Sequence, residues 1–432
     1  MKCVVVGAGW SGLAAAVRLS SHGFDVTLLE AAAQPGGRAR DVCWGDRVID
    51  NGQHLMIGAY QKMFELIRDV GQNPEALFDR SPLNLVIHSS HYPSLHLNAN
   101  SAAPWPLPLL SGLMKSLGIR DFVRLLRFSL RISHYLKNHH STVLQWCQQT
   151  AQSDRLISQL WEPLCLATMN TPINEASAQV FARVLKDSLL TKREHADLLI
   201  AKRSLGSVFP TAAIEYLKAR QHEIHFQSRV VSVRSQDNKV IAVETSRGEV
   251  FDCDQLILAC HADQITRLVP AADQVTFNHY PITTIYLQYS ADIRLSTPMI
   301  GSSGTLSQWL FDRSSYYPGL IAVVISGPGP HVQMTSERLV EHVCDEILQL
   351  QPQLPAAPLE SKVIREKKAT FACTADIHPV RPLNQTPVRG LWLAGDHIAH
   401  PYPATLEAAI SNGVSCAQAI IKTVQRVSIS QQ

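Results

Sequence analysis

The hydrophobic pattern at the start of the chain predicts a βαβ unit. Residues 2–6 (KCVVV) form a short β-branched run that is typical of a buried parallel strand. An alanine-rich stretch from about Ser11 to His22 predicts a helix that ends at Gly23, and residues 25–30 (DVTLLE) predict the next strand. Strand, helix and strand in this order indicate a parallel sheet.

Later blocks of the pattern predict two interleaved domains. A Pro-containing stretch, 81–110, precedes a long helical region that extends to about Leu217. Strands are expected at 225–233, 256–259 and 391–394, β-type runs dominate 281–326, and helical spacing returns at 335–350 and after Thr405. We predict an α/β fold with one Rossmann-like domain built from residues 1–80, 205–275 and 363–432. A second, α+β domain comprises a helical segment, 81–204, and a sheet segment, 276–362.

Composition narrows the class of protein. Apolar residues make up 46% and charged residues 17% of the chain, which indicates a large globular core, and a formal charge of +3 gives no reason to expect a nucleic-acid partner. The cysteines lack C-x-x-C spacing and the histidines lack H-x-H and H-E-x-x-H spacing, so we expect neither disulfides nor a metal site. A glycine turn interrupts the first apolar run, and no apolar stretch reaches ~20 residues, so we expect a cytoplasmic protein without a signal peptide or membrane span.

A glycine-rich turn after the first strand predicts a dinucleotide site. Gly7-Ala8-Gly9-Trp10-Ser11-Gly12 has G-x-G-x-x-G spacing between a strand and a helix. Gly7 permits the tight turn, Gly9 lets a pyrophosphate approach the backbone, and Gly12 lets helix and strand pack closely. The helix N-terminus offers unpaired N–H groups to the phosphates, and Glu30 at the end of the second strand can accept hydrogen bonds from the ribose hydroxyls. A glycine turn used only for packing would leave Glu30 unexplained.

Two further segments favour FAD over NAD as the nucleotide. Pro35-Gly36-Gly37-Arg38 follows shortly after Glu30 and can bring backbone and a guanidinium to the pyrophosphate. Near the other end, Gly395 and Asp396 follow a strand, and Thr405 and Leu406 begin a helix that can close over the ribityl chain and direct its dipole at the flavin. Simple NAD dehydrogenases lack both features, so the chain is predicted to be an FAD-dependent oxidoreductase.

These motifs together resemble a superfamily that comprises flavin amine oxidases, protoporphyrinogen oxidases and carotenoid desaturases. The matching pieces are GAGWSG, Glu30, PGGRAR, LWLAGD and TLEAAISNG. The resemblance implies that Val230 contacts adenine through its backbone, that Asp396 hydrogen-bonds near the ribityl–phosphate junction, and that Asn51, Gly52, Gln53 and His54 lie beside the flavin. The implied architecture is an FAD-binding Rossmann-like domain with an interleaved α+β substrate-binding domain of the amine oxidase or phytoene desaturase type.

A narrower resemblance concerns the substrate. The segment from Asp50 to Tyr60 looks like members that act on squalene- or carotene-sized chains, and residues 161–178, 369–373 and 401–405 look most like bacterial hydroxysqualene dehydroxylases. This implies reduction of hydroxysqualene to squalene in squalene or hopanoid biosynthesis, in which the allylic hydroxyl leaves as water and an electron donor regenerates the reduced flavin. A carotene or phytoene-type desaturase, another flavin amine oxidase and a non-enzymatic prenyl-lipid escort of the same fold stay open as alternatives.

His54 is our candidate for protonating the leaving hydroxyl. Imidazole has a pKa suited to acid–base work near neutral pH, and the resemblance places its loop beside the flavin. The alternative interpretation is that His54 and Gln53 only hydrogen-bond the loop or the edge of the flavin, because buried polar groups are generally satisfied structurally.

Residues 120–137 predict a helix with a basic stripe. Arg120, Arg124, Arg127 and Arg131 recur at helical spacing, and six apolar residues from Phe122 to Ile132 occupy most of the remaining circumference. This pattern suits a helix that lies in the surface of an anionic membrane, on the cytoplasmic face of the inner membrane, where a long apolar substrate is stored. An ordinary helix packed in the second domain with a solvated arginine edge is the alternative.

Overall fold

A parallel sheet organises the first domain. The computed structural model describes residues 1–98, 104–269 and 276–430, and the predicted domain boundary after residue 275 borders a stretch outside them. Five strands lie in the order β10-β2-β1-β14-β20, and every neighbouring pair is parallel. Their bounds are β1 (Lys2–Val6), β2 (Asp25–Leu29), β10 (Glu223–His225), β14 (Gln255–Leu258) and β20 (Leu391–Leu393). Each of the three segments predicted for this domain therefore contributes a strand.

Helices cover one face of this sheet, and a small antiparallel sheet together with one short helix covers the other. Val5 packs among helices, whereas Val4 and Val6 pack towards the sheet β11-β12-β13. The alanines of the first helix keep it thin, so that it is buried between the sheet and the C-terminal helix. These elements are α1 (Trp10–Ser20), α2 (Gln61–Asp69), α10 (Leu205–Val208), α11 (Pro210–Ala219), α12 (Ala262–Leu268), α15 (Leu406–Ser430), β11 (Val230–Gln236), β12 (Lys239–Thr245) and β13 (Val250–Asp252).

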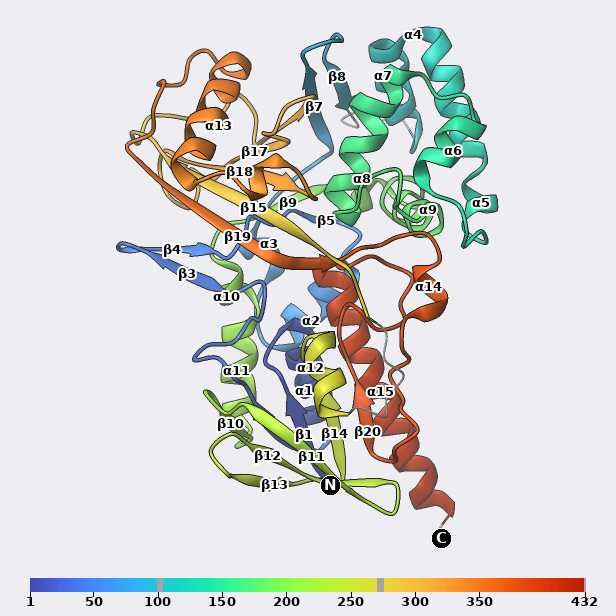
Figure 1. The fold of residues 1–432 in the computed structure, drawn as a ribbon, viewed down its shortest axis with the longest axis vertical. Coiled ribbons are helices and arrows are strands. Elements are labelled where there is room, and N and C mark those ends of the chain that lie inside the picture. The colour runs from blue at the N-terminus through green and yellow to red at the C-terminus, as the bar shows by residue number, and fades with distance from the viewer. Residues whose placement is uncertain (99–103, 270–275, 431–432) are drawn as a thin grey trace.

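The second domain combines a mixed seven-stranded sheet with a group of helices (Figure 1). The strand order is β19-β15-β18-β17-β16-β7-β8, and only the β16–β7 pair is parallel. The bounds are β7 (Asn84–Ser89), β8 (Leu95–Asn98), β15 (His279–Gln288), β16 (Met299–Ser303), β17 (Trp309–Asp312), β18 (Leu320–Ser326) and β19 (Glu360–Phe371). Two features differ from the prediction: β7 and β8 come from the segment predicted as helical, and β19 runs across the expected boundary at residue 362.

The helices of the second domain pack around an aromatic stack. Phe128 lies between Trp146 and Trp161, with ring centroids 3.8 and 3.9 Å away and nearly parallel planes. Stacking of these rings accompanies the burial of a large apolar area. The helical elements are α4 (Leu107–Leu130), α5 (Ile132–Tyr135), α6 (Val143–Gln149), α7 (Asp154–Leu156), the π-helical η1 (Ile157–Trp161), α8 (Glu162–Met169), α9 (Ala178–Leu185) and the π-helical η2 (Lys186–Leu190).

The helix predicted over 120–137 differs in extent and in its apolar face. It belongs to α4, which begins at Leu107, breaks at Gly118 and ends at Leu130. Of the six apolar residues expected to face lipid, Leu125, Phe128 and Ile132 are buried in the domain and Leu130 is exposed. The reason is the aromatic stack, which holds Phe128 and turns that side of the helix inwards.

Short elements complete the chain. β3 and β4 form a hairpin, and β9 pairs with both β5 and β6 in a separate small sheet. No helix in the described part of the chain has the length and hydropathy needed to cross a bilayer. The remaining bounds are β3 (Asp41–Trp44), β4 (Arg47–Asp50), β5 (Met56–Ile57), β6 (Phe78–Ser81), β9 (Leu198–Ala201), α3 (Pro74–Leu77), η3 (Arg193–Ala196), η4 (Pro330–Val332), α13 (Ser336–Leu350) and α14 (Ile377–Val380).

Candidate FAD and substrate site

The turn between β1 and α1 forms an open cradle for phosphates. A Cβ on Gly7 would lie 2.6 Å from the carbonyl oxygen of Ala259, and one on Gly12 would lie 2.0 Å from the carbonyl oxygen of Gly7, so both positions require glycine. Gly9 caps α1 without a side-chain hydrogen bond, which leaves the first N–H groups of the helix for a ligand. The buried Oγ of Ser11 also has no hydrogen-bond partner among the described residues. These features fit a bound pyrophosphate.

Glu30 lies at the end of β2 and borders the same cradle. Its carboxylate accepts the N–H groups of Ala8 at 2.6 Å and Ala32 at 2.8 Å, which fixes the side chain over the turn. The N–H of Ser228 donates to the backbone carbonyl of Glu30, and this places the start of β11, with the buried Val230, beside it. The arrangement fits the ribose and adenine of a nucleotide.

Arg38 and Asp396 join the first and last segments of the chain at the cavity. Arg38 Nη2 lies 2.6 Å from Asp396 Oδ1, and Arg38 Nη1 donates to the carbonyl of Ala369 at 2.7 Å. Burial disfavours the charged form of Asp396, but the guanidinium and His397 together hold the pKa of Asp396 well below its ordinary value. The aspartate is therefore ionised and can accept a hydrogen bond from a ligand hydroxyl.

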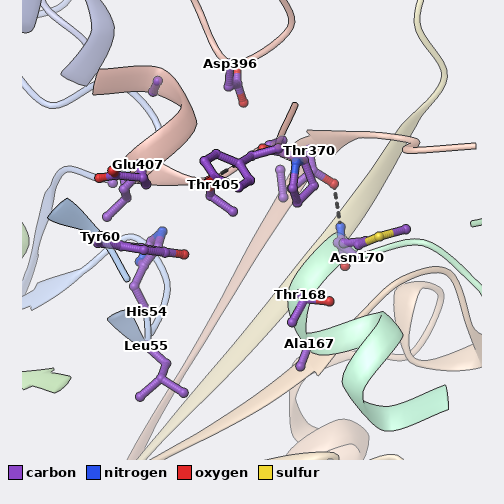
Figure 2. A pocket seen from close by; sticks show the side chains of 18 of the residues that line it. His54, Leu55, Tyr60, Ala167, Thr168, Asn170, Thr370, Asp396, Thr405 and Glu407 are labelled. Atoms are coloured by element: carbon purple, nitrogen blue, oxygen red, sulfur yellow. Dashed lines mark hydrogen bonds between the residues drawn. The ribbon is translucent and has the colours of Figure 1, made fainter. Parts of the chain in front are cut away.

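The loop after β4 and the start of α15 line one side of the cavity. Figure 2 shows His54, Tyr60, Thr405 and Glu407 on this side, facing Thr168 and Asn170 of α8 and its C-terminus. Asn51 donates to the carbonyl of Arg38 at 3.1 Å and to Glu366 at 3.0 Å, which secures the beginning of the loop.

The geometry of His54 makes its imidazole an acceptor towards the cavity at neutral pH. Nδ1 lies 2.8 Å from the carbonyl oxygen of Gly52, which can only accept, so Nδ1 carries the hydrogen. Burial lowers the pKa of His54, and the nearby Arg38 adds to this shift. The ring is therefore neutral with an unprotonated Nε2, an arrangement that supports a hydrogen-bonding role for His54 over the role of acid.

One cavity of about 720 Å³ connects the cradle to a chamber in the second domain. Sixteen of the eighteen residues predicted to bind the cofactor line this cavity, and so does His54. The two exceptions are Ala8, whose backbone N–H and carbonyl bond Glu30 and Gly36, and Gly12, which packs beneath the turn. The chamber is lined mainly by apolar side chains, as expected for a site that binds a hydrocarbon. Its wall includes Leu83, Leu85, Leu97, Leu109, Leu113, Leu125, Leu160, Trp161, Leu164, Met169, Leu185, Leu198, Met299, Trp309, Phe311 and Val324.

Asn170 connects two of the motifs that carry the narrower resemblance. It ends α8 in a left-handed conformation, its amide nitrogen donates to Thr370 Oγ1 at 2.9 Å, and its amide oxygen accepts the N–H of Gly327 at 2.6 Å. Nearby, the Thr171 hydroxyl accepts the N–H of Cys373 at 2.9 Å. The segments 161–178 and 369–373 therefore contact each other at the cavity wall, although about 190 positions separate them in the sequence.

Several residues at the site were not singled out from the sequence. The Arg381 guanidinium is buried and donates to the carbonyls of Asp396, His400 and Tyr402, so that it shapes the loop before α15. Tyr402 and Asp187 pair across the cavity wall. A buried arginine has no local sequence signal, whereas Tyr402 lies within the PYPAT motif and could have been considered from it.

Comparison with known proteins identifies the family. A family model described as flavin containing amine oxidoreductase matches residues 10–421. The chain belongs to this family. A hydroxysqualene dehydroxylase from Zymomonas mobilis is 28% identical over 96% of this chain and 97% of its own length, and a 15-cis-phytoene desaturase from Solanum lycopersicum is 20% identical over 98% of this chain and 78% of its own length.

Solved structures show the same fold. A putative protoporphyrinogen oxidase from Exiguobacterium sp. 255-15 superposes with a TM-score of 0.71 at 16% identity, over 97% of this chain and 98% of that one. The predicted α/β fold and the superfamily resemblance are thus confirmed. Family membership also confirms that the cofactor is FAD and that the chain is an FAD-dependent oxidoreductase. The alternative of a non-enzymatic prenyl-lipid escort is therefore not supported.

Proposed function

We propose that this enzyme reduces hydroxysqualene to squalene. The observation that carries the proposal is the single cavity in which a nucleotide cradle opens into a long apolar chamber. Its lining, which is mainly aliphatic and aromatic, favours a hydrocarbon chain, because such a wall gives apolar contacts along the substrate. Full-length similarity to hydroxysqualene dehydroxylases, stronger than that to phytoene desaturases, supports the same substrate class.

We further propose how the chain holds the cofactor. The N-terminus of α1 with Gly7, Gly9 and Ser11 would bind the pyrophosphate, Glu30 the ribose and the Val230 backbone the adenine. Gly36, Gly37 and the Arg38–Asp396 pair would enclose the phosphate and ribityl region, while Asn51, Gly52, Gln53, Gly395, Thr405 and Leu406 would surround the flavin. Trp10 would have a structural role, since its indole N–H donates to the carbonyl of Ala39.

The reaction divides between the cofactor and the protein. Bound FAD, once reduced, would supply the hydride. The protein orients the chain, excludes water and provides the proton with which the allylic hydroxyl leaves as water. An external electron donor must restore the reduced cofactor after each turnover.

The direction of hydride transfer distinguishes the proposal from its main alternative. Enzyme reduced under anaerobic conditions and mixed with hydroxysqualene should form squalene in one turnover while the flavin absorbance near 450 nm returns, and enzyme with oxidised flavin is the control that should form none. A phytoene-type desaturase would instead leave hydroxysqualene unchanged and desaturate phytoene with oxidised flavin. That second outcome would overturn the proposal.

We also propose that α4 contacts the membrane that stores the substrate, at the cytoplasmic surface of the inner membrane. Ile119 and Leu130 are 75% and 82% exposed, and exposed Met114 and Val123 accompany them. Exposed basic residues lie among them, and Asp121 is the one acidic residue between positions 107 and 137. The opposite side of α4 lines the chamber through Leu109, Leu113 and Leu125, so one helix borders both the outer surface and the substrate cavity.

A further inference from the structure

A hydrogen-bonded pair on the cavity wall links two distant parts of the chain. Tyr402 Oη donates to Asp187 Oδ2 at 2.6 Å. Tyr402 lies in the loop just before α15, and Asp187 lies in the π-helical segment η2, a form of helix that is often found at functional sites. Both residues line the cavity. In the sequence, Tyr402 shortly precedes the predicted flavin contacts Thr405 and Leu406, and Asp187 lies among the apolar residues of η2.

Three other hydroxyls on this wall donate to the backbone. Ser129, Thr168 and Ser188 each donate to the carbonyl four residues earlier in their own helix, at 3.0, 2.7 and 2.7 Å. Thr370 accepts the amide of Asn170. These side chains serve local structure, and an aliphatic hydroxyl or an amide is a weaker acid than a phenol.

Three titratable groups near the flavin end, Glu407, Glu366 and His54, already hydrogen-bond other parts of the protein. Both oxygens of Glu407 accept backbone N–H groups, from Lys62 and Met63, at 2.9 Å each. Glu366 accepts the amide of Asn51, and the neutral His54 presents an unprotonated Nε2. Among these groups, the Tyr402–Asp187 pair combines a hydroxyl at the cavity with a carboxylate behind it.

Asp187 also has a connection to solvent. Its side chain is 25% exposed, and Arg183 Nη1 lies 3.8 Å from the carboxylate oxygen that Tyr402 does not contact. Burial, together with the hydrogen bond to Asp187, raises the pKa of Tyr402 above its ordinary value, so the phenol keeps its proton at neutral pH. Protons can therefore reach the half-buried phenol through a carboxylate that water contacts.

We propose that Tyr402 is the proton donor to the substrate hydroxyl and that Asp187 positions and reprotonates it. The inference rests on the proposed function. The phenol hydrogen, which Asp187 holds before the substrate binds, turns to the substrate oxygen. As this proton passes to that oxygen, the C–O bond breaks with both electrons and water leaves. A proton from Asp187, taken up from solvent, restores Tyr402 across the same hydrogen bond. The resulting allylic cation is neutralised by the hydride that reduced FAD supplies, so one proton and one hydride convert the alcohol into hydrocarbon and water.

Binding without turnover tests the contact directly. With oxidised flavin no hydride is available, so the affinities for hydroxysqualene and squalene can be compared at equilibrium. Wild type should bind the alcohol about fivefold to tenfold more tightly, as expected for one hydrogen bond. Tyr402→Phe should remove this preference and leave the affinity for squalene unchanged. The control Tyr280→Phe breaks a similar Tyr–carboxylate pair, with Glu175, away from the cavity wall, and should retain the preference.

Single turnover by the reduced enzyme tests the proton transfer. Tyr402→Phe and Asp187→Asn should slow squalene formation at least ~100-fold, the usual contribution of a positioned acid, and Asp187→Glu should recover much of the rate. Thermal melts and the bound-flavin spectrum establish that each variant is folded. If wild type turns over and Tyr402→Phe keeps both the preference and the rate, the inference is wrong. If wild type itself fails to form squalene, the proposed function is wrong instead.

Discussion

Glu407 is a buried carboxylate whose protonation is coupled to folding. Its two oxygens accept the N–H groups of Lys62 and Met63 in the first turn of α2, which favours the charged form. Burial opposes this and is the larger effect, so the pKa of Glu407 is raised from 4.5 to about 7. Because the folded pKa lies above that of the unfolded chain, folding favours the protonated group. Its contribution to stability is therefore complete below about pH 4.5 and is lost as the pH rises to about 7.

Glu407→Gln should remove this pH dependence. Between pH 4.5 and 7 the free energy of unfolding of wild type should fall relative to the variant by roughly 3 kcal/mol, the equivalent of the pKa difference. Denaturant unfolding at several pH values measures it. Glu65→Gln is the control, because Lys62 lowers the pKa of the exposed Glu65 and its contribution is already complete above pH 4.5. A constant difference between wild type and Glu407→Gln would contradict the expectation.

At the scale of elements, α4 should determine attachment to membranes. Replacing Ile119 and Leu130 by Glu removes two exposed apolar side chains and adds negative charge beside Arg120 and Arg127. Each inserted aliphatic side chain is worth about 1.5–3 kcal/mol, so flotation with anionic phospholipid vesicles should fall more than tenfold. The matched control replaces Leu359 and Leu383, which are 74% and 70% exposed elsewhere, and should float like wild type. Equal flotation of both double variants would exclude α4 as the contact.

The same elements show what the sequence could and could not predict. The glycine turn, Glu30 and the strands around them follow local spacing, so the cradle was predictable residue by residue. The ion pair between Arg38 and Asp396 joins residues more than 350 positions apart, and only the packing of the parallel sheet brings them together. Likewise, the apolar residues of α4 divide between core and surface according to the aromatic stack on Phe128, a tertiary contact that helical periodicity does not encode.

At the scale of the whole molecule, the proposed FAD site is assembled from three distant segments. The residues that line the cradle come from 6–39, 228–230 and 395–406, which also border strands of one parallel sheet. A ligand that contacts all three should connect them as a single cooperative unit, because it binds only when they are together. Stability should then rise with FAD concentration, by about 2.7 kcal/mol at 100 times Kd.

Hydrogen exchange of the apoprotein and the FAD-loaded protein measures this cooperation. Added FAD should slow amide exchange in all three segments by a similar factor, since local opening of any one of them would release the ligand. Helix α13 lies over the seven-stranded sheet, far from these segments in Figure 1, and serves as the internal control with unchanged exchange. Arg38→Ala should uncouple the third segment, because Asp396 would lose its ion pair, while protection of residues 7–12 persists. Protection confined to residues 7–12 in wild type would mean that the glycine turn alone holds the cofactor.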